Sequence, residues 1–319
     1  MIKVVYEGEM GMSRAKKVVL AIVGVILAMT LVVVGIGVKV YLDVQNSMDR
    51  TYESVERTHN ADGNKSTSTP DLKQQQPFSV LLLGVDTGEY GRTDQGRSDS
   101  MMVAVVNPKK EHTALLSIAR DTYVPIVGYG KDDKINHAYA FGGTAMSMDT
   151  VESYLDIPIN YYVSINMKGL EDLVDAVGGI TIGNDTQFTQ GEYTFNHGKI
   201  NLDGPAALAY SRMRKEDPRG DYGRQERQRT IVMAIVKKVL TMDGITNYPK
   251  ILEAIEANMK TNMSFDDMKK IALDYRSAFG SIAPDQLKGE GFMQDNISYQ
   301  RVSEDELKRV QNNLKQELR

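Results

Sequence analysis

The stretch FSVLLLGVDTGEYGRTDQGRSDSMMVAVVNPKKEHTALLSIARD, residues 78–121, contains three apolar runs of strand length. The first run, residues 78–86, is continuously apolar and ends in an aspartate, which is typical of a strand buried on both faces. A Gly-rich polar loop leads to the second run, residues 101–107, and a short polar turn leads to the third, residues 113–121. As a meander, the second strand runs antiparallel to the first, and the third returns parallel to it.

This meander places charged side chains at one end of the predicted sheet. They are Asp86 after the first strand, Arg97 and Asp99 where the second begins, and Arg120 and Asp121 after the third. Open sheets flanked by helices bind ligands beyond such strand ends. Asp86 and Asp99 can face each other there, and paired carboxylates suit Mg²⁺, which shares its shell with waters and a substrate phosphate. A simple turn-forming role is the alternative interpretation of Asp99.

Helical patterns follow the meander. Residues 166–179, NMKGLEDLVDAVGG, predict an amphipathic helix that stops at two glycines, and residues 179–182 predict another strand. Asp203 with Pro205 close behind it indicates the start of a second helix. A third helix is expected over residues 223–240, GRQERQRTIVMAIVKKVL, because its apolar positions recur at helical spacing.

Arginine is concentrated between the last two helices. Residues 209–229, AYSRMRKEDPRGDYGRQERQR, hold six arginines and one lysine against four acids. Arg224, Arg227 and Gln228 share one helix face, and arginine in a first helical turn opposes the helix dipole. A helix N-terminus with guanidinium groups favours a phosphate-like anion, which would offset this cost. The alternative is a solvated face with local ion pairs to Asp221 and Glu226, each worth about 0 to 1 kcal/mol.

Composition excludes several classes of function. The 319-residue chain has a formal net charge of −4, which argues against a general nucleic-acid binder. It contains no cysteine, so disulfides and thiolate metal sites are impossible, and this absence is common in exported proteins of Gram-positive bacteria. The four histidines are too dispersed for a zinc site, and the sequence has neither a P-loop motif nor G-x-S-x-G.

A stretch of 21 uncharged residues, VVLAIVGVILAMTLVVVGIGV, occupies positions 18–38. It is long enough to cross the roughly 30 Å of a bilayer core, and no cleavage pattern of a signal peptide follows it. Arg14, Lys16 and Lys17 precede it, so the positive-inside rule places the N-terminus in the cytoplasm. We predict a cytoplasmic tail at 1–17, a transmembrane helix at 18–38 and an extracellular stalk and linker at 39–77.

Six ordered segments resemble the LytR-CpsA-Psr family of cell-wall proteins. They are LLLGVD, GRSDSMMV, SIARDTYV, KINHAYAFGG, NYYVSINMKGLEDLVDAVGGI and LDGPAALAYSRMRKEDPRGDYGRQERQR. The resemblance covers about residues 78–240, and its one departure is Ala119, where many relatives carry proline. It implies an α/β/α sandwich with a central mixed sheet, preceded by one transmembrane helix, and with a hydrophobic tunnel for a polyprenyl chain. The polar, helical pattern after residue 240 predicts a helical C-terminal appendage at 241–319.

The resemblance also implies an activity at the cell membrane of a Gram-positive bacterium. This activity is the transfer of a glycopolymer, such as wall teichoic acid or capsule, from a polyprenyl-pyrophosphate carrier to peptidoglycan, with Mg²⁺ or Mn²⁺ as cofactor. Two alternatives are a non-catalytic sensor of lipid-linked precursors and a pyrophosphatase that hydrolyses the donor. A sensor would bind the lipid pyrophosphate tightly without Mg²⁺-dependent release of polyprenyl phosphate, and a pyrophosphatase would release phosphate-terminated polymer even without a peptidoglycan acceptor.

Site residues follow from the same resemblance. Asp86 and Asp99 would hold the metal ion. The pyrophosphate would be bound by Arg97, Arg120, Arg212, Arg214, Arg224 and Gln228. Asp99, Arg120 and Asp221 are the candidate catalytic residues, with Asp221 or Asp99 as the base. The remaining cations of the arginine-rich stretch are expected to be solvated, namely Lys215, Arg219, Arg227 and Arg229.

Overall fold

The computed structural model describes residues 37–57, 69–86, 96–214, 216–240 and 248–319. The chain divides into two compact units, residues 1–46 and 47–319. In the first unit the described residues, 37–46, are helical. Within the described ranges no helix has both the length and the apolar character needed to cross a membrane. The predicted span at 18–38 lies outside these ranges except for its last two residues.

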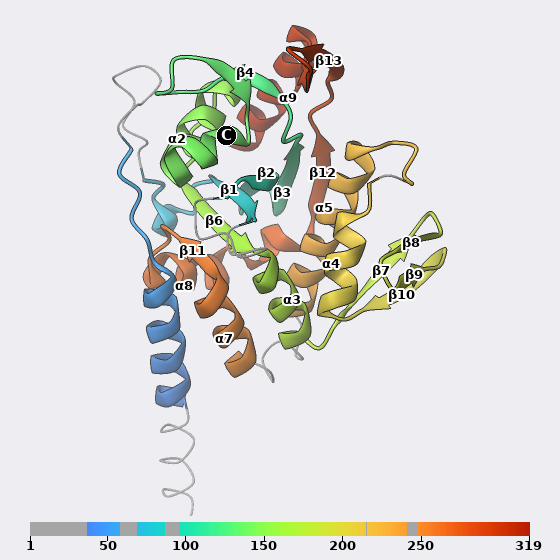
Figure 1. Ribbon diagram of the computed structural model, residues 1–319. Helices are drawn as coiled ribbons and strands as arrows, with labels where there is room; N and C mark the ends of the chain where they lie inside the picture. Colours follow the sequence, from blue (N-terminus) through green and yellow to red (C-terminus); the bar gives the residue numbers. More distant parts are fainter. Residues whose placement is uncertain (1–36, 58–68, 87–95, 215, 241–247) are drawn as a thin grey trace, which may run out of the picture. The chain divides into compact units, whose positions relative to one another are not determined.

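A mixed sheet with the strand order β11-β6-β1-β2-β3-β12 forms the centre of the second unit (Figure 1). Its strands are β1 (Phe78–Val85), β2 (Ser98–Asn107), β3 (His112–Ile118), β6 (Tyr161–Asn166), β11 (Met259–Thr261) and β12 (Ile282–Gln286). β2 pairs antiparallel with both β1 and β3, which confirms the predicted meander. β6 is parallel to β1 and β12 is parallel to β3, whereas β11 is antiparallel to β6.

Helices cover both faces of this sheet, so the predicted three-layer α/β arrangement is confirmed. On one face, Leu81 and Val103 pack with residues of α2 (His137–Leu155) and α9 (Glu304–Glu317). On the other, Met102 and Leu115 pack with Val232 of α5 (Asp221–Val239). Because β1 and β2 are covered on both sides, their sequences are continuously apolar rather than alternating. A short hairpin, β4 (Tyr123–Pro125) and β5 (Asp132–Lys134), links β3 to α2.

A second hydrophobic cluster joins several helices to small hairpins. Its helices are α3 (Met167–Ala176), α4 (Gly204–Arg212), α5 and α7 (Tyr248–Asn258), and its strands are β7 (Ile180–Asn184), β8 (Phe188–Gln190), β9 (Tyr193–Phe195) and β10 (Gly198–Leu202). The strand predicted at 179–182 forms, but it pairs with β10 outside the central sheet. The side chain of Asp203 caps α4 by accepting the Ala206 N–H at 2.9 Å, as its sequence indicates.

The C-terminal region corrects the prediction of a helical appendage at 241–319. In its described part, residues 248–319, β11 and β12 form the two edges of the central sheet. β13 (Glu290–Gln294) and β14 (Ile297–Arg301) make a hairpin, and α9 completes the core, while α8 (Phe265–Asp274) and η3 (Arg276–Gly280) lie between the edge strands in sequence. The edge strands are three and five residues long, so pairing with an already buried strand decides their structure, and local propensity does not.

Part of the predicted stalk and linker at 39–77 also packs within the second unit. Arg57, whose side chain is 10% exposed, donates from Nε to Asp149 of α2 and lies 3.2 Å from Glu152. The Glu53 N–H donates to the carbonyl of Thr261 in β11 at 2.8 Å. Residues 69–77 include a short 3-10 helix, η1 (Leu72–Gln74), whose Leu72 is buried. Residues 47–57 and 69–77 therefore belong to the folded unit, whereas residues 58–68 lie outside the described ranges.

Candidate active site

The ends of β1 and β2 bring two of the predicted carboxylates onto neighbouring strands. Val85 pairs with Ser98 and Gly84 pairs with Ser100, so Asp99 is the extra residue of a β-bulge. The buried carboxylate of Asp86 accepts the Arg97 N–H, and the Asp86 N–H donates to the Arg97 carbonyl at 3.1 Å. Bulges redirect side chains next to binding sites. Asp86 and Asp99 thus share one end of the sheet, as the meander predicts.

Arg120 follows β3 and joins this end of the sheet. Its NH1 donates to Asp99 Oδ1 at 2.7 Å, and its Nε lies 3.8 Å from Asp121 Oδ2. Lys134 of β5 donates to the other oxygen of Asp121, also at 2.7 Å. Burial lowers the pKa of Arg120, but the negative charges of Asp99, Asp121 and Asp221 outweigh it, so the pKa lies above its ordinary value. This arginine is fixed by carboxylates on both sides.

The first turn of α5 faces Arg120 with two further charged residues. Asp221 and Arg224 are buried, and Arg224 NH2 lies 2.7 Å from Asp221 Oδ1. Arg214 Nε is 4.0 Å from the same oxygen. Burial lowers the pKa of Arg224, and the positive charges of Arg120 and Arg214 lower it further. The negative charges of Asp221 and Asp99 raise it, but the pKa stays below its ordinary value. Because guanidinium groups stay protonated, an anion bound between Arg120 and Arg224 would relieve this repulsion.

An apolar cavity of about 290 Å³ adjoins the charged site. It lies between β1, β2 and β6 on one side and α3 and α5 on the other, and its apolar lining includes Leu82, Met102, Val163, Ile165, Leu170 and Ile231. Ser100 and Gln228 also line it, and they neighbour Asp99 in β2 and Arg224 on α5. A Cβ on Gly84 would come 2.9 Å from the Cβ of Ser100, so glycine keeps this part of the cavity open. An apolar chain with an anionic end fits such a pair of sites.

Two predicted pyrophosphate ligands are less closely tied to this centre. The side chains of Arg97 and Arg212 are exposed. Arg97 contributes its backbone N–H to Asp86, and Arg212 is the last residue of α4. Arg214 is exposed as well, but its Nε lies 4.0 Å from the Asp221 carboxylate, and Gln228 lines the cavity. The pyrophosphate-binding roles of all six residues, Arg97, Arg120, Arg212, Arg214, Arg224 and Gln228, remain predictions.

The prediction that the other cations are solvated is wrong for Arg227 and Arg229, which are both buried. Arg227 NH1 donates to Asp217 Oδ2 at 2.6 Å, and its guanidinium lies 5.4 Å from the centre of the Phe188 ring. Arg229 donates to Ser117 Oγ of β3 at 2.9 Å. Helix α5 is surrounded by other elements, so even its polar positions find buried partners. Lys215 lies outside the described residues.

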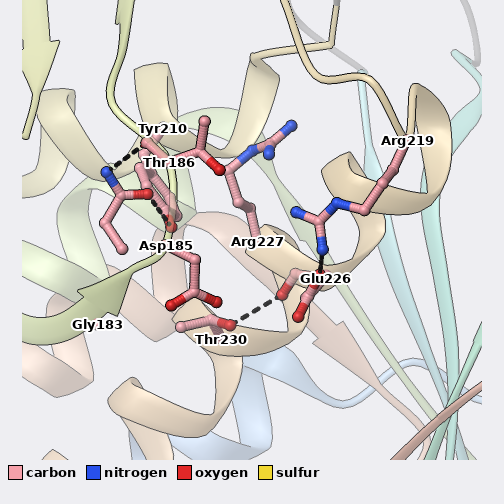
Figure 2. A pocket seen from close by; sticks show the side chains of 9 residues that line it. Gly183, Asp185, Thr186, Tyr210, Arg219, Glu226, Arg227 and Thr230 are labelled. Carbon is pink, nitrogen blue, oxygen red and sulfur yellow. Dashed lines mark hydrogen bonds and ion pairs between the residues drawn. The ribbon is translucent and has the colours of Figure 1, made fainter. Parts of the chain in front are cut away.

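Figure 2 shows Arg227 and Arg219 beside Glu226 and Tyr210. These side chains line a small pocket of about 30 Å³.

The turn between the two arginine clusters is closed by Asp217, which also contacts Arg227 and Arg219. The Asp217 carboxylate accepts hydrogen bonds from Arg227 and from Arg219, whose N–H and Nε both donate to Oδ1. A Cβ at Gly223 would clash with this carboxylate, so the turn requires glycine there. These contacts set the spacing between Arg214 and Arg224.

Sequence reasoning missed Gln225 and Gln286. Gln225 Nε2 donates to Asp221 Oδ2 at 2.9 Å, and Gln286 Nε2 donates to Gln225 Oε1 at 3.0 Å. The four-residue spacing between Asp221 and Gln225 is a signal that could have found the first contact. No sequence signal points to Gln286, because its strand was expected to belong to a separate appendage.

Fold and site together define an α/β protein with a cluster of arginines and carboxylates beside an apolar cavity. The chain belongs to the LytR_cpsA_psr family, whose model matches residues 38–316. It is 60% identical over 307 residues to an Enterococcus faecalis protein named polyisoprenyl-teichoic acid--peptidoglycan teichoic acid transferase TagU, covering 96% of this chain and 99% of the relative.

Solved structures agree with this assignment. A crystal structure from Enterococcus faecalis, described as a transcriptional regulator, has a TM-score of 0.71 and 48% identity, and the match covers 78% of this chain and 90% of that one. A structure described as TagT bound to LIIa-WTA has a TM-score of 0.69 and 30% identity, with 83% and 99% covered. The central mixed sheet is therefore shared with solved relatives.

Proposed function

We propose that the chain is a phosphotransferase that attaches a teichoic acid or a similar glycopolymer to peptidoglycan, from a polyprenyl-pyrophosphate carrier. One observation carries this proposal, namely that half-buried Arg120 and buried Arg224 lie close enough for the charge of one to lower the pKa of the other, next to residues that line an apolar cavity. In a donor with a pyrophosphate head and an isoprenoid tail, the head would bind to the two arginines and the tail would occupy the apolar cavity. The name of the Enterococcus faecalis relative and the description of the TagT structure support the same substrate class.

The reaction needs positioning and charge stabilisation more than covalent chemistry by the protein. A hydroxyl of a peptidoglycan sugar attacks the polymer-linked phosphorus, and the bond from this phosphorus to the bridging oxygen breaks. Polyprenyl phosphate leaves with that oxygen, and the hydroxyl proton passes to Asp221. Arg120 and Arg224 stabilise the charge that develops on the leaving phosphate, since fixed donors in a buried site are effective there.

The carboxylates of Asp86 and Asp99 fit a magnesium ion. Asp99 lies in β2 and Asp86 directly follows β1, at the same sheet end, and the described residues contain no group of three or more His, Asp or Glu side chains suited to a metal. Mg²⁺ is usually held by one or two carboxylates, with waters and substrate phosphates completing its shell. When bound, Mg²⁺ or Mn²⁺ would neutralise pyrophosphate oxygens. Asp99 would then exchange part of its contact with Arg120 for the metal.

Location at the membrane is part of the same proposal. Residues 18–38 would anchor the chain, with residues 1–17 in the cytoplasm and the second unit outside the cell. A lipid-linked donor is confined to the membrane. Anchoring the enzyme in the same membrane raises the effective concentration of the donor at the enzyme.

The test uses the full chain in detergent with a polyprenyl-pyrophosphate-linked disaccharide, purified peptidoglycan and Mg²⁺. We expect disaccharide phosphate to become covalently attached to peptidoglycan, as detected by mass spectrometry of digested product. Release of disaccharide phosphate without acceptor, at a rate faster than transfer, would indicate a pyrophosphatase instead. Tight binding of the donor with no release of polyprenyl phosphate would indicate a sensor.

A further inference from the structure

Asp221 is held by a chain of contacts that begins in the C-terminal part of the protein. Gln286 lies at the end of β12, and its Nε2 donates to the Tyr222 carbonyl at 3.1 Å and to Gln225 Oε1 at 3.0 Å. Gln225 Nε2 then donates to Asp221 Oδ2 at 2.9 Å. Gln225 and Asp221 are both buried, so water does not replace these contacts easily.

The direction of this chain is fixed by the backbone. The nitrogen and oxygen of a glutamine amide are assigned from their hydrogen-bond partners. The Tyr222 carbonyl can only accept, so the Gln286 atom that faces it must be the NH₂ group. The second N–H of this group points to Gln225, which must therefore present its oxygen. The NH₂ group of Gln225 is then turned toward Asp221.

This arrangement gives the two oxygens of Asp221 different roles. Oδ2 accepts the N–H of Gln225, whereas Oδ1 faces Arg224 at 2.7 Å and Arg214 at 4.0 Å. Oδ1 is buried and has no hydrogen-bond partner of acceptable geometry among the described residues. An amide N–H on Oδ2 prevents the carboxylate from rotating and keeps Oδ1 beside Arg224 with a lone pair that accepts no hydrogen bond from the described residues, so Oδ1 can take the proton once the acceptor hydroxyl enters beside it.

We propose that Gln225 and Gln286 are positioning residues, which hold Asp221 so that Oδ1 accepts the proton of the acceptor hydroxyl. This rests on the proposed function, because it deepens the role of a residue in the same site. Neither glutamine touches the substrate. They act through Asp221, and they make the C-terminal edge strand a part of the reaction centre.

Independent contacts tie the same C-terminal segment to both sides of the site. The Tyr222 hydroxyl donates to the Gly289 carbonyl at 2.7 Å and accepts the Gly289 N–H at 2.6 Å. The Gln300 N–H donates to the Asp121 carbonyl at 2.9 Å. The segment from β12 to β14 thus fixes the first turn of α5 relative to the turn that carries Arg120.

The test replaces each glutamine by methionine, which keeps length and burial but removes the amide. In the transfer assay with polyprenyl-pyrophosphate-linked disaccharide and purified peptidoglycan, Gln225→Met should lower kcat about 10- to 100-fold, since small misplacements of a catalytic group are costly. KM for the donor should stay within about twofold of wild type, because donor contacts are intact. Gln286→Met should lower kcat less, and the double variant should lose no more than Gln225→Met alone.

A matched control is Gln311→Met, because Gln311 also donates across elements, to the Tyr154 carbonyl at 3.0 Å, but lies on α9. It should keep wild-type kcat. Gln225→Glu is nearly isosteric and should lose at least as much kcat as Gln225→Met, since it sets a second carboxylate against Asp221. A packing role would tolerate Gln225→Glu and give additive losses in the double variant, so either result would overturn the proposal.

A measurement without turnover separates this proposal from the proposed function. Crystal structures of wild type and Gln225→Met should show Asp221 in different side-chain orientations. Failure of the wild-type protein to transfer would defeat the proposed function, whereas an unmoved Asp221 in Gln225→Met would defeat the positioning role. The two failures are therefore distinguishable.

Discussion

Arg224 and Arg227 lie three residues apart on α5, are both buried and belong to the same arginine-rich stretch. Arg227 is held by Asp217, by the Met213 carbonyl and by the Phe188 ring. Arg224 shares Asp221 with Arg214 and is repelled by Arg120. The charge of Arg227 is balanced by these contacts, whereas Arg224 stands beside two further arginines, a cluster that we propose binds an anionic ligand. Both arginines are buried, so the contacts of each side chain, and not its burial, distinguish them.

The largest effect on stability should come from Arg227→Met. This change leaves the buried carboxylate of Asp217 without its main partner, and breaking a buried ion pair costs about 3 to 5 kcal/mol. Urea unfolding of the full chain in detergent should show this loss. The double change Arg227→Met with Asp217→Asn should recover part of it, and no recovery would mean that the pair is not the cause.

The same pair predicts a pH dependence. Burial raises the pKa of Asp217, but hydrogen bonds from Arg227 and Arg219 outweigh it and hold the pKa below its ordinary value. A carboxyl with a depressed folded-state pKa stabilises the protein above the unfolded-state pKa of about 3.9 and loses this contribution as the pH falls through the folded-state value. The gap between wild type and Arg227→Met in free energy of unfolding should therefore shrink below about pH 4.

Arg224→Met should remove activity but cost less stability than Arg227→Met, because Asp221 keeps its hydrogen bond from Gln225 and the repulsion of Arg224 by Arg120 and Arg214 is relieved. Loss of one fixed donor that stabilises transition-state charge costs about 100- to 1000-fold in kcat. The transfer assay measures this effect, and urea unfolding of the same preparation measures stability. If Arg224→Met lowers the free energy of unfolding as much as Arg227→Met does, Arg224 has a structural role like that of Arg227.

Gly223→Ala should have an intermediate effect on stability. The added Cβ would clash with the Asp217 carboxylate and force the turn open, at a cost of about 1 to 3 kcal/mol. Transfer activity should fall as well, since the turn sets the spacing between Arg214 and Arg224. Gly183→Ala is a control with the same chemical change, because its Cβ would meet no atom within 4 Å.

The smallest effect is expected for Arg219→Ala. Arg219 pairs with Glu226 and Asp217, but about half of its side chain is exposed. Exposed ion pairs contribute about 0 to 1 kcal/mol, so the free energy of unfolding should change by no more than this. If Arg219→Ala lowered the free energy of unfolding as much as Arg227→Met, the exposure of Arg219 would not explain a difference between the two ion pairs.

The sequence predicts best what is encoded locally. The strands next to Asp86, Asp99 and Arg120 are long apolar runs, and the cap at Asp203 lies beside the helix that it starts. The family resemblance added the roles of these residues. The burial of Arg227 and Arg229 could not be predicted, since it depends on Asp217 closing a turn and on Ser117 of a distant strand.

The edge strands were missed for the same physical reason. β12 contains Pro284 and Asp285, and its extended structure comes from pairing with β3. Gln286 could not be connected to Asp221 without knowing this pairing. Residues with the weakest local signals thus include some that shape the reaction centre.

Arg57 determines where the chain can be shortened. Its guanidinium neutralises Asp149 and Glu152 inside α2, and it also donates to the Ile159 carbonyl at 3.2 Å. A fragment that starts at residue 69 keeps every strand of the central sheet but loses this cation, so buried Asp149 and half-buried Glu152 would lose their partner. A fragment that starts at residue 47 keeps it. The choice of the first residue therefore decides whether a crystallisation fragment folds well, even though both versions contain the entire reaction centre.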